Sequence, residues 1–233
     1  MALIAPADQD VLREAFAEMT RPVRVLFFTQ TLDCPTCLQA RQILDELPVL
    51  SDKIGIEEVN VILEKDRAKQ FGIEAVPAMA ITYEEGGEQR DSRIRFLGTP
   101  AGYEFVSLVQ AVMLAGGRES RLSPESRTQL EKLERPLTMQ VFTTPTCPHC
   151  PRAVTLAHEM AFASPQITAF AVEATEFPEL ARRYHVSGVP KTVVNDAIEI
   201  LGAIPEPDFV AQALLDTAHH EATEDTKHTE NKT

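Results

Sequence analysis

Short apolar runs alternate with amphipathic stretches along the first half of the chain, and this alternation predicts a mixed α/β fold. Strands are predicted at the apolar runs, at about 23–28, 54–62, 78–83 and 93–97. Helices are predicted where apolar residues recur at helical spacing, at about 8–20, 38–47, 64–71 and 101–115. Asp8 or Asp10 is expected to cap the first helix, and Pro48 to close the second. A hairpin turn is expected across 84–92.

The same order of elements recurs in the second half. Strands are predicted at about 137–142, 167–172, 192–194 and 197–201. Helices are predicted at about 123–134, 152–162, 177–184 and 207–218. Ser123 is placed to cap the first of these helices. We therefore expect two domains, residues 1–118 and 119–218, each with a mixed four-stranded sheet flanked by helices. Residues 219–233 have almost no apolar side chains and are expected to be a disordered tail.

The two halves are related by a constant offset, which marks an internal repeat. Cys34 and Cys147 are 113 residues apart, and so are Pro77 and Pro190. The main difference between the halves is a longer hairpin in the first, a length change that a surface turn tolerates. The chain is therefore expected to be a duplicated domain.

All four cysteines lie in two Cys-x-x-Cys motifs, Cys34-Pro35-Thr36-Cys37 and Cys147-Pro148-His149-Cys150. Each motif follows a predicted strand and precedes a predicted helix, which is the context of a redox-active pair. Thiol–disulfide exchange needs one thiolate that attacks and a second thiol that resolves the mixed disulfide. The N–H groups and the dipole at a helix N-terminus stabilise the thiolate. The pattern therefore predicts dithiol chemistry at both motifs.

Composition narrows the setting of this chemistry. Hydrophobic residues make up 44% of the 233 residues and charged ones 24%, so each half can bury a core. The net charge of −13 argues against nucleic acid as a partner, because phosphate binding needs clustered Lys and Arg. We find no apolar run long enough to span a membrane and no signal-peptide pattern in residues 1–10. A cytoplasmic location is therefore expected, where paired thiols are catalytic or metal-binding more often than structural.

Four cysteines in two pairs are also compatible with one zinc ion or with two inert disulfides. Zinc ribbons usually space their pairs by about 15–20 residues, whereas here Cys37 and Cys147 are 110 residues apart and each pair has its own repeat. A reducing cytoplasm disfavours inert disulfides. The chain has no G-x-G-x-x-G motif for a dinucleotide or a flavin. We expect no bound metal and no bound cofactor, only the redox-active cysteine pairs.

Each half, with its strand–CxxC–helix order and its Val-Pro before the third strand, resembles the thioredoxin and glutaredoxin fold. Over about residues 8–218 the chain resembles the protein disulfide oxidoreductases, which have tandem glutaredoxin-like domains, each with a CxxC. The resemblance implies that Cys34 and Cys147 are exposed attacking thiols and that Cys37 and Cys150 are more buried resolving thiols. It also implies two loops in which a cis-proline faces the cysteines and the residue before it binds an incoming polypeptide. The residues of these loops are Val76, Pro77, Val189 and Pro190.

Two features depart from the thioredoxin pattern. Thioredoxins have Trp directly before the first cysteine, whereas Asp33 and Thr146 stand there in this chain, which contains no Trp. Thioredoxins also have an acidic residue six positions before that cysteine, whereas Phe28 and Val141 stand there. A group other than the usual carboxylate must therefore take the proton of the resolving thiol.

The two pairs are not expected to be equivalent. Asp33 places a negative charge beside Cys34, which is expected to raise the pKa of that thiol. A donating or charged His149 stabilises the thiolate of the second pair, and with it the reduced form. Cys147 and Cys150 are therefore expected to have the higher reduction potential and to carry out most of the exchange with proteins. The residues that modulate the pairs are Asp33, Pro35, Thr36, Pro148 and His149.

These observations predict an enzyme, a thiol–disulfide oxidoreductase that reduces, forms or isomerises protein disulfides. The resemblance implies a thioredoxin-reductase-like flavoprotein or glutathione as the electron donor and a peroxiredoxin as one recipient. An alternative is an electron relay, because the chain also resembles the tandem thioredoxin-like N-terminal part of the alkyl hydroperoxide reductase flavoprotein. That part typically keeps one working CxxC, whereas this chain has two. A third reading is a non-catalytic module that binds extended peptides.

Overall fold

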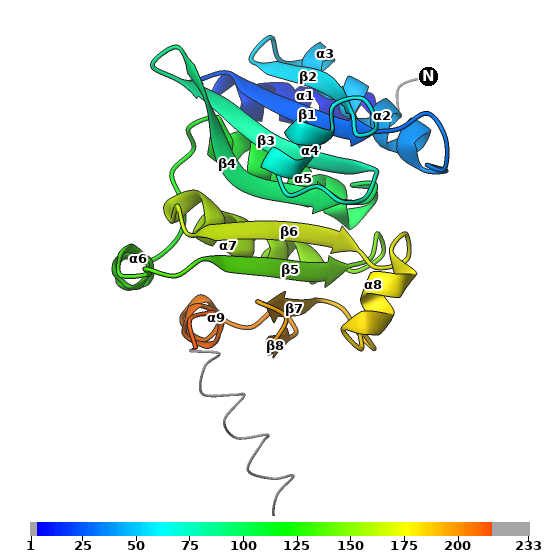
Figure 1. The fold of residues 1–233 in the computed structure, drawn as a ribbon. Helices are drawn as coiled ribbons and strands as arrows, with labels where there is room; N and C mark the ends of the chain where they lie inside the picture. The colour runs from blue at the N-terminus through cyan, green and yellow to red at the C-terminus, as the bar shows by residue number, and fades with distance from the viewer. Residues whose placement is uncertain (1–3, 216–233) are drawn as a thin grey trace, which may run out of the picture.

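The computed structural model describes residues 4–215, and the predicted tail at 219–233 lies outside them. Its strands form one eight-stranded mixed sheet in the order β2-β1-β3-β4-β6-β5-β7-β8 (Figure 1). The strands of the first half are β1 (Val23–Thr29), β2 (Ile54–Asn60), β3 (Ala78–Glu85) and β4 (Glu88–Leu97). Those of the second half are β5 (Leu137–Thr143), β6 (Ile167–Glu173), β7 (Lys191–Val194) and β8 (Ile198–Leu201). The predicted α/β class is confirmed.

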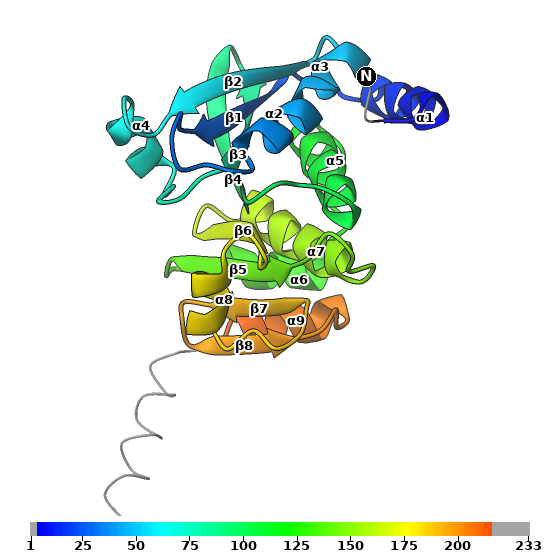
Figure 2. The same cartoon turned by 90° about the vertical axis from the view of Figure 1, so that its right-hand side faces the viewer.

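Helices cover both faces of this sheet. The first half contains α1 (Pro6–Ala17), α2 (Cys37–Asp45), α3 (Leu47–Leu50), α4 (Lys65–Gln70) and α5 (Tyr103–Ala115). The second half contains α6 (Pro124–Glu131), α7 (Cys150–Ala163), α8 (Pro178–Arg183) and α9 (Glu206–Ala213). Figure 2 shows α5, α7 and α9 on one side of the sheet and α4 and α8 on the other. None of the helices within residues 4–215 is long and apolar enough to cross a membrane.

Alternating strand residues separate the core into two layers. On β1, Val25 and Phe27 belong to a large cluster that includes buried residues of α2, α5, α7 and α9. The intervening Leu26 and Phe28 face the other side and pack in a smaller cluster with Ala68 of α4. The large cluster contains residues of both halves, so the two repeats share one core layer.

The two four-stranded units predicted from the sequence are joined edge to edge. Strand β4 pairs in parallel with β6, with Ile94 opposite Ala169 and Leu97 opposite Val172. This pairing satisfies the backbone groups that the edge of each unit would otherwise leave open. The seam between β4 and β6 places the second repeat beside the first.

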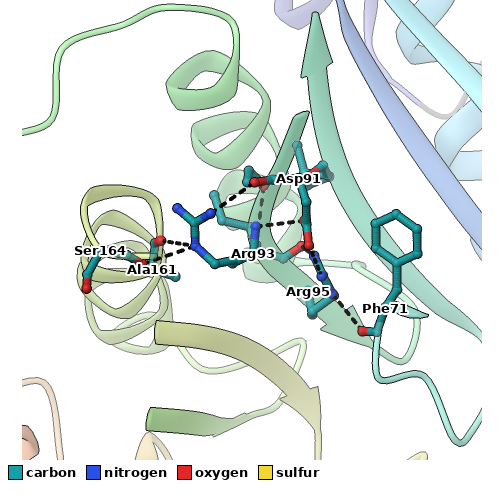
Figure 3. A network of polar contacts seen from close by, with 9 residues as sticks. Phe71, Asp91, Arg93, Arg95, Ala161 and Ser164 are labelled. Carbon is teal, nitrogen blue, oxygen red and sulfur yellow. Dashed lines mark hydrogen bonds and ion pairs between the residues drawn. The ribbon is translucent and has the colours of Figure 1, made fainter. Parts of the chain in front are cut away.

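A side chain from β4 reinforces this seam (Figure 3). The Nε of Arg93 donates to the carbonyl oxygens of Ala161 at 3.0 Å and Ser164 at 3.1 Å, at the C-terminal end of α7. Arg93 lies in a bulge, because Ile81 pairs with Ile94 whereas the next residue of β3 already pairs with Asp91. The bulge redirects the arginine from the sheet toward α7. Its guanidinium satisfies carbonyls that a helix end leaves without intrahelical partners.

The structure changes several predicted boundaries. Helix α1 begins at Pro6 after Ala5, without a side-chain cap, so the predicted capping role of Asp8 or Asp10 is wrong. Pro48 does not close α2; it lies in the first turn of the short helix α3, where a missing N–H costs nothing. The predicted cap at Ser123 is confirmed, because its Oγ accepts from the backbone N–H of Ser126 at 3.2 Å.

The hairpin of the first half is tighter than predicted. Gly86 and Gly87 form the turn alone, with φ of 62° and 80°, and Glu85 pairs directly with Glu88. Two residues at positive φ give a turn whose twist matches the flanking strands. The charged residues on either side therefore extend the strands, because an exposed strand end tolerates polar side chains.

Candidate active sites at the two CxxC motifs

The N-terminal pair lies in the loop between β1 and α2. Cys34 and Cys37 form a disulfide with their Cα atoms 5.4 Å apart. Helix α2 begins at Cys37, so Pro35 lies in the turn before it and not at its first helical position. Cys34 is partly exposed, whereas Cys37 is 8% exposed. The exposures agree with an accessible first sulfur and a covered second one.

The C-terminal pair has the same geometry but is more enclosed. Cys147 and Cys150 form a disulfide with their Cα atoms 5.5 Å apart, and α7 begins at Cys150. Cys150 is fully buried and Cys147 is only 8% exposed. The implied exposure of Cys147 is therefore wrong for the disulfide form. The loop before it packs against the first half, where the N–H of Tyr103 donates to the carbonyl of Pro145 at 2.9 Å.

A cis Val-Pro bond stands beside each pair. The Val76–Pro77 and Val189–Pro190 peptide bonds are both cis. Strand β3 starts directly after Pro77 and is antiparallel to β1, which places the start of β3 opposite the end of β1 that leads to the CPTC loop. Strand β7 has the same relation to β5 in the second half. Both prolines are buried, and both valines are partly exposed.

The sulfurs of the two pairs differ in their hydrogen bonds. The backbone N–H of Cys150 donates to the Sγ of Cys147 at 3.1 Å. In the first pair the corresponding N–H of Cys37 donates to the carbonyl oxygen of Cys34 at 3.4 Å. A donor aimed at sulfur stabilises a thiolate there. This difference favours the thiolate at Cys147.

The residues around the cysteines are mostly at the surface. Pro35, Pro148 and His149 are exposed. Asp33 is also exposed and has a φ of 57°, a left-handed conformation that Asp tolerates better than most residues. Thr36 is half-buried, and its hydroxyl donates to Glu176 of the second half. No cluster of three or more His, Cys, Asp or Glu able to hold a metal ion occurs within residues 4–215.

One acidic residue beside the second pair was not predicted. Glu104, on α5 of the first half, is 2% exposed and lies with Thr143 and Glu173 around a small enclosed cavity. Burial raises the pKa of Glu104 to about 7, and the charge of Glu173 adds to the rise against the opposing effect of the hydroxyls of Thr143 and Ser107. Thr143 is the last residue of β5, immediately before the CPHC loop. A carboxyl group able to exchange protons near neutral pH therefore lies close to this loop.

Its position could have been noticed in the sequence. Glu104 is the one acidic residue within the otherwise apolar helix α5, and it is buried together with Ser107 and Leu108. A buried acid in such a helix indicates a special environment. Its proximity to the second cysteine pair depends on the packing of one half against the other.

The fold and the two CxxC sites define a thioredoxin-like oxidoreductase. Residues 137–215 match the thioredoxin domain family. The whole structure is similar to the NTD_N/C domain of the alkyl hydroperoxide reductase AhpF from Enterococcus faecalis, at 25% identity and a TM-score of 0.83, covering 89% of this chain and 98% of that one. It is equally similar to a protein disulfide oxidoreductase from Aeropyrum pernix, at 29% identity and a TM-score of 0.82, covering 90% and 91%. The resemblance stated from the sequence is confirmed.

Curated sequences give the same relation. The chain is 26% identical over 204 residues to the alkyl hydroperoxide reductase flavoprotein, AhpF, of Xanthomonas campestris, and 27% identical over 185 residues to that of Escherichia coli. These matches cover 88% and 79% of this chain but only 36% and 32% of the relatives. The chain thus spans about a third of the length of the curated relatives it matches.

Proposed function

We propose that the chain exchanges dithiols for disulfides in protein substrates through both CxxC sites, reducing, forming or isomerising their disulfides. The observation that carries the proposal is the repeated arrangement of a cysteine pair at the start of a helix, beside a cis Val-Pro bond. The helix start favours a thiolate, and the strand end beside it offers backbone groups to an extended polypeptide. Val76, Pro77, Val189 and Pro190 would make these contacts.

In the reductive direction, the Cys147 thiolate attacks one sulfur of a substrate disulfide. A mixed disulfide forms, and the other substrate sulfur leaves as a thiolate that takes up a proton. The Cys150 thiolate then attacks the Cys147 sulfur and releases the second substrate thiol. Two electrons pass to the substrate, and the pair returns to the disulfide seen here. Glu104 supports this cycle as a nearby group that exchanges protons around pH 7. Cys34 and Cys37 would run the same cycle.

An insulin reduction assay with dithiothreitol, followed by turbidity, tests this function. Wild type should accelerate precipitation, Cys147→Ser should lose most of the acceleration, and Cys34→Ser should retain most of it. The reason is the better stabilised thiolate at Cys147, which accepts the N–H of Cys150. Equal inactivity of wild type and both variants would reject the enzyme in favour of a peptide-binding module. Activity that survives Cys147→Ser but not Cys34→Ser would reverse the assignment of the main site.

A second candidate function is electron relay. It is favoured by the match over 98% of the E. faecalis AhpF domain. In this role a thioredoxin-reductase-like flavoprotein, or glutathione, reduces a cysteine pair, and a peroxiredoxin accepts the electrons. Peroxide-dependent NADH consumption by a flavoprotein reductase and a peroxiredoxin, with and without this chain, would distinguish relay from general disulfide reduction.

The remaining assignments follow from the same proposal. We assign residues 1–118 and 119–218 to the two repeats and place the protein in the cytoplasm, where a reductase keeps such pairs cycling. The acidic net charge of −13 makes proteins, and not nucleic acid, the partners. Asp33, Pro35, Thr36, Pro148 and His149 would tune the two potentials.

A further inference from the structure

A carboxylate of the second half reaches the cysteine pair of the first. The hydroxyl of Thr36, which lies between Cys34 and Cys37, donates to the Oε2 of Glu176 at 2.5 Å. The other carboxylate oxygen, Oε1, accepts from the backbone N–H of Thr99 at 2.8 Å. Glu176 thus ties the CPTC loop to the loop between β4 and α5.

The seam between the halves delivers Glu176 to this position. Beyond the paired ends of β4 and β6, Gly98 packs so closely on Glu173 that a Cβ at Gly98 would lie 2.5 Å from the Cβ of Glu173. The buried carboxylate of Glu173 accepts from the backbone N–H groups of Thr175 at 3.2 Å and Glu176 at 2.6 Å. It also accepts from the Thr175 hydroxyl at 2.7 and 2.8 Å. These bonds hold the loop that carries Glu176.

The contact changes what Thr36 can do. Thr36 is the N-cap of α2, yet its side chain makes no capping bond. Its hydroxyl proton is directed to the carboxylate and is therefore withheld from the sulfur of Cys34. No ion pair within residues 4–215 includes Glu176, so no basic side chain offsets its charge there. A negative charge close to a cysteine destabilises the thiolate.

The second pair has no such contact. The residue that corresponds to Thr36 is His149, which is exposed and makes no capping bond. The position one repeat before Glu176 is Leu63, an apolar side chain that is 82% exposed. The internal repeat therefore reproduces the cysteine pairs and the cis-prolines but not the carboxylate. Only the CPTC pair is placed under the influence of an acid from the other half.

We propose that Glu176 is a positioning residue for the Cys34–Cys37 pair, through which the second half keeps that pair more reducing than Cys147–Cys150. The inference deepens the proposed function and rests on it. Reduction of the pair by glutathione opens one S–S bond to two thiols, while two glutathione thiols become one glutathione disulfide, so that electrons and protons balance. A destabilised thiolate shifts this equilibrium toward the Cys34–Cys37 disulfide.

A glutathione titration of the full chain tests the proposal, with the redox state read by thiol alkylation and mass. One pair is isolated at a time by changing the other pair to serine. Glu176→Gln should raise the equilibrium constant for reduction of Cys34–Cys37 about three- to tenfold, equivalent to about 15–30 mV. The same substitution should leave Cys147–Cys150 unchanged. Its effect should also shrink in a Thr36→Val background, because the two side chains act through one hydrogen bond.

Glu179→Gln is the matched control, because Glu179 is an exposed residue of α8 that pairs with Arg182 and lies three positions from Glu176. It should shift neither pair. A Glu176→Gln protein whose Cys34–Cys37 constant equals that of wild type would overturn the proposal, as would an equal shift of both pairs. Failure of the Cys34–Cys37 pair to titrate with glutathione in wild type would instead reject its redox function, and the inference with it.

Discussion

At the residue scale, the two cysteine pairs share a backbone and differ in their neighbours. The sulfur of Cys147 accepts an N–H, whereas the hydroxyl beside Cys34 is turned toward Glu176. Both differences favour the thiolate at Cys147. Glu104 adds a buried acid on the side of the second pair. The identity of a few side chains therefore decides how two copies of one motif divide the chemistry.

The burial of Glu104 makes stability depend on pH. Its pKa rises from 4.5 to about 7 because burial disfavours the charged form. Between these values the folded state binds more protons than the unfolded state, so the free energy of unfolding falls as the pH rises. Above about pH 7 the whole penalty, about 3 kcal/mol, is present. Glu104→Gln should therefore unfold in urea with up to about 3 kcal/mol more stability than wild type at pH 8, and with little gain at pH 4.

The exposed Glu131, on α6, provides the control for this measurement. Glu131→Gln should change the free energy of unfolding by less than about 0.5 kcal/mol at either pH. A Glu104→Gln protein whose gain is the same at pH 4 and pH 8 would show that the carboxyl does not titrate with a raised pKa.

At the scale of elements, α7 is the helix on which both repeats depend. It begins at Cys150, so its N-terminus faces the second cysteine pair, and its C-terminal carbonyls accept from Arg93 of β4. Arg93 also donates through Nη2 to the carbonyl of Phe162 at 3.3 Å. The helix that activates one pair is thus anchored by the other repeat.

Removal of this anchor should lower stability. Arg93→Ala leaves three helix-end carbonyls without their charged donor and should reduce the free energy of unfolding by about 1–3 kcal/mol. Arg90→Ala, in the same strand, removes an exposed pair with Glu88 and should cost less than about 1 kcal/mol. Urea denaturation monitored by far-UV circular dichroism measures both. Equal losses in the two variants would mean that the bonds to α7 contribute nothing to stability.

At the scale of the whole molecule, the seam between β4 and β6 brings each CxxC loop into contact with the opposite repeat. Glu176 of the second half holds Thr36, and Tyr103 of the first half holds Pro145. The repeats therefore do not merely lie side by side, because each completes the surroundings of the other's cysteines. Disturbance of the seam is expected to reach both sites.

Gly98 is the most sensitive point of this seam. Its φ is +105°, and an added Cβ would lie 2.5 Å from the Cβ of Glu173. Gly98→Ala should cost about 1–3 kcal/mol through overpacking, with a further cost from the left-handed conformation. Gly188→Ala, at a site with nothing within 4 Å of the added Cβ, is the control and should cost less than about 1 kcal/mol. Thermal unfolding compares them, and similar melting temperatures for the two variants would contradict a tightly packed seam.

Much of the architecture followed from local pattern. Apolar runs marked all eight strands, and the equal spacing of Cys34 to Cys147 and of Pro77 to Pro190 marked the repeat. Errors occurred where local rules compete. Pro48 ends a helix by one rule and begins one by another, and the structure uses the second. The hairpin around Gly86 was predicted too long, because charged residues in a protruding strand look like loop.

The sequence by itself determined the strands and helices, the duplication and the four cysteines, because these depend on side-chain periodicity and short-range spacing. Only the tertiary structure decided that the two sheets fuse through β4 and β6, because either edge could have remained open. It also decided that Cys147 is enclosed and that Glu104 and Glu176 lie near cysteine pairs of the opposite repeats. Those contacts join residues far apart in the chain, and no local pattern encodes such distances.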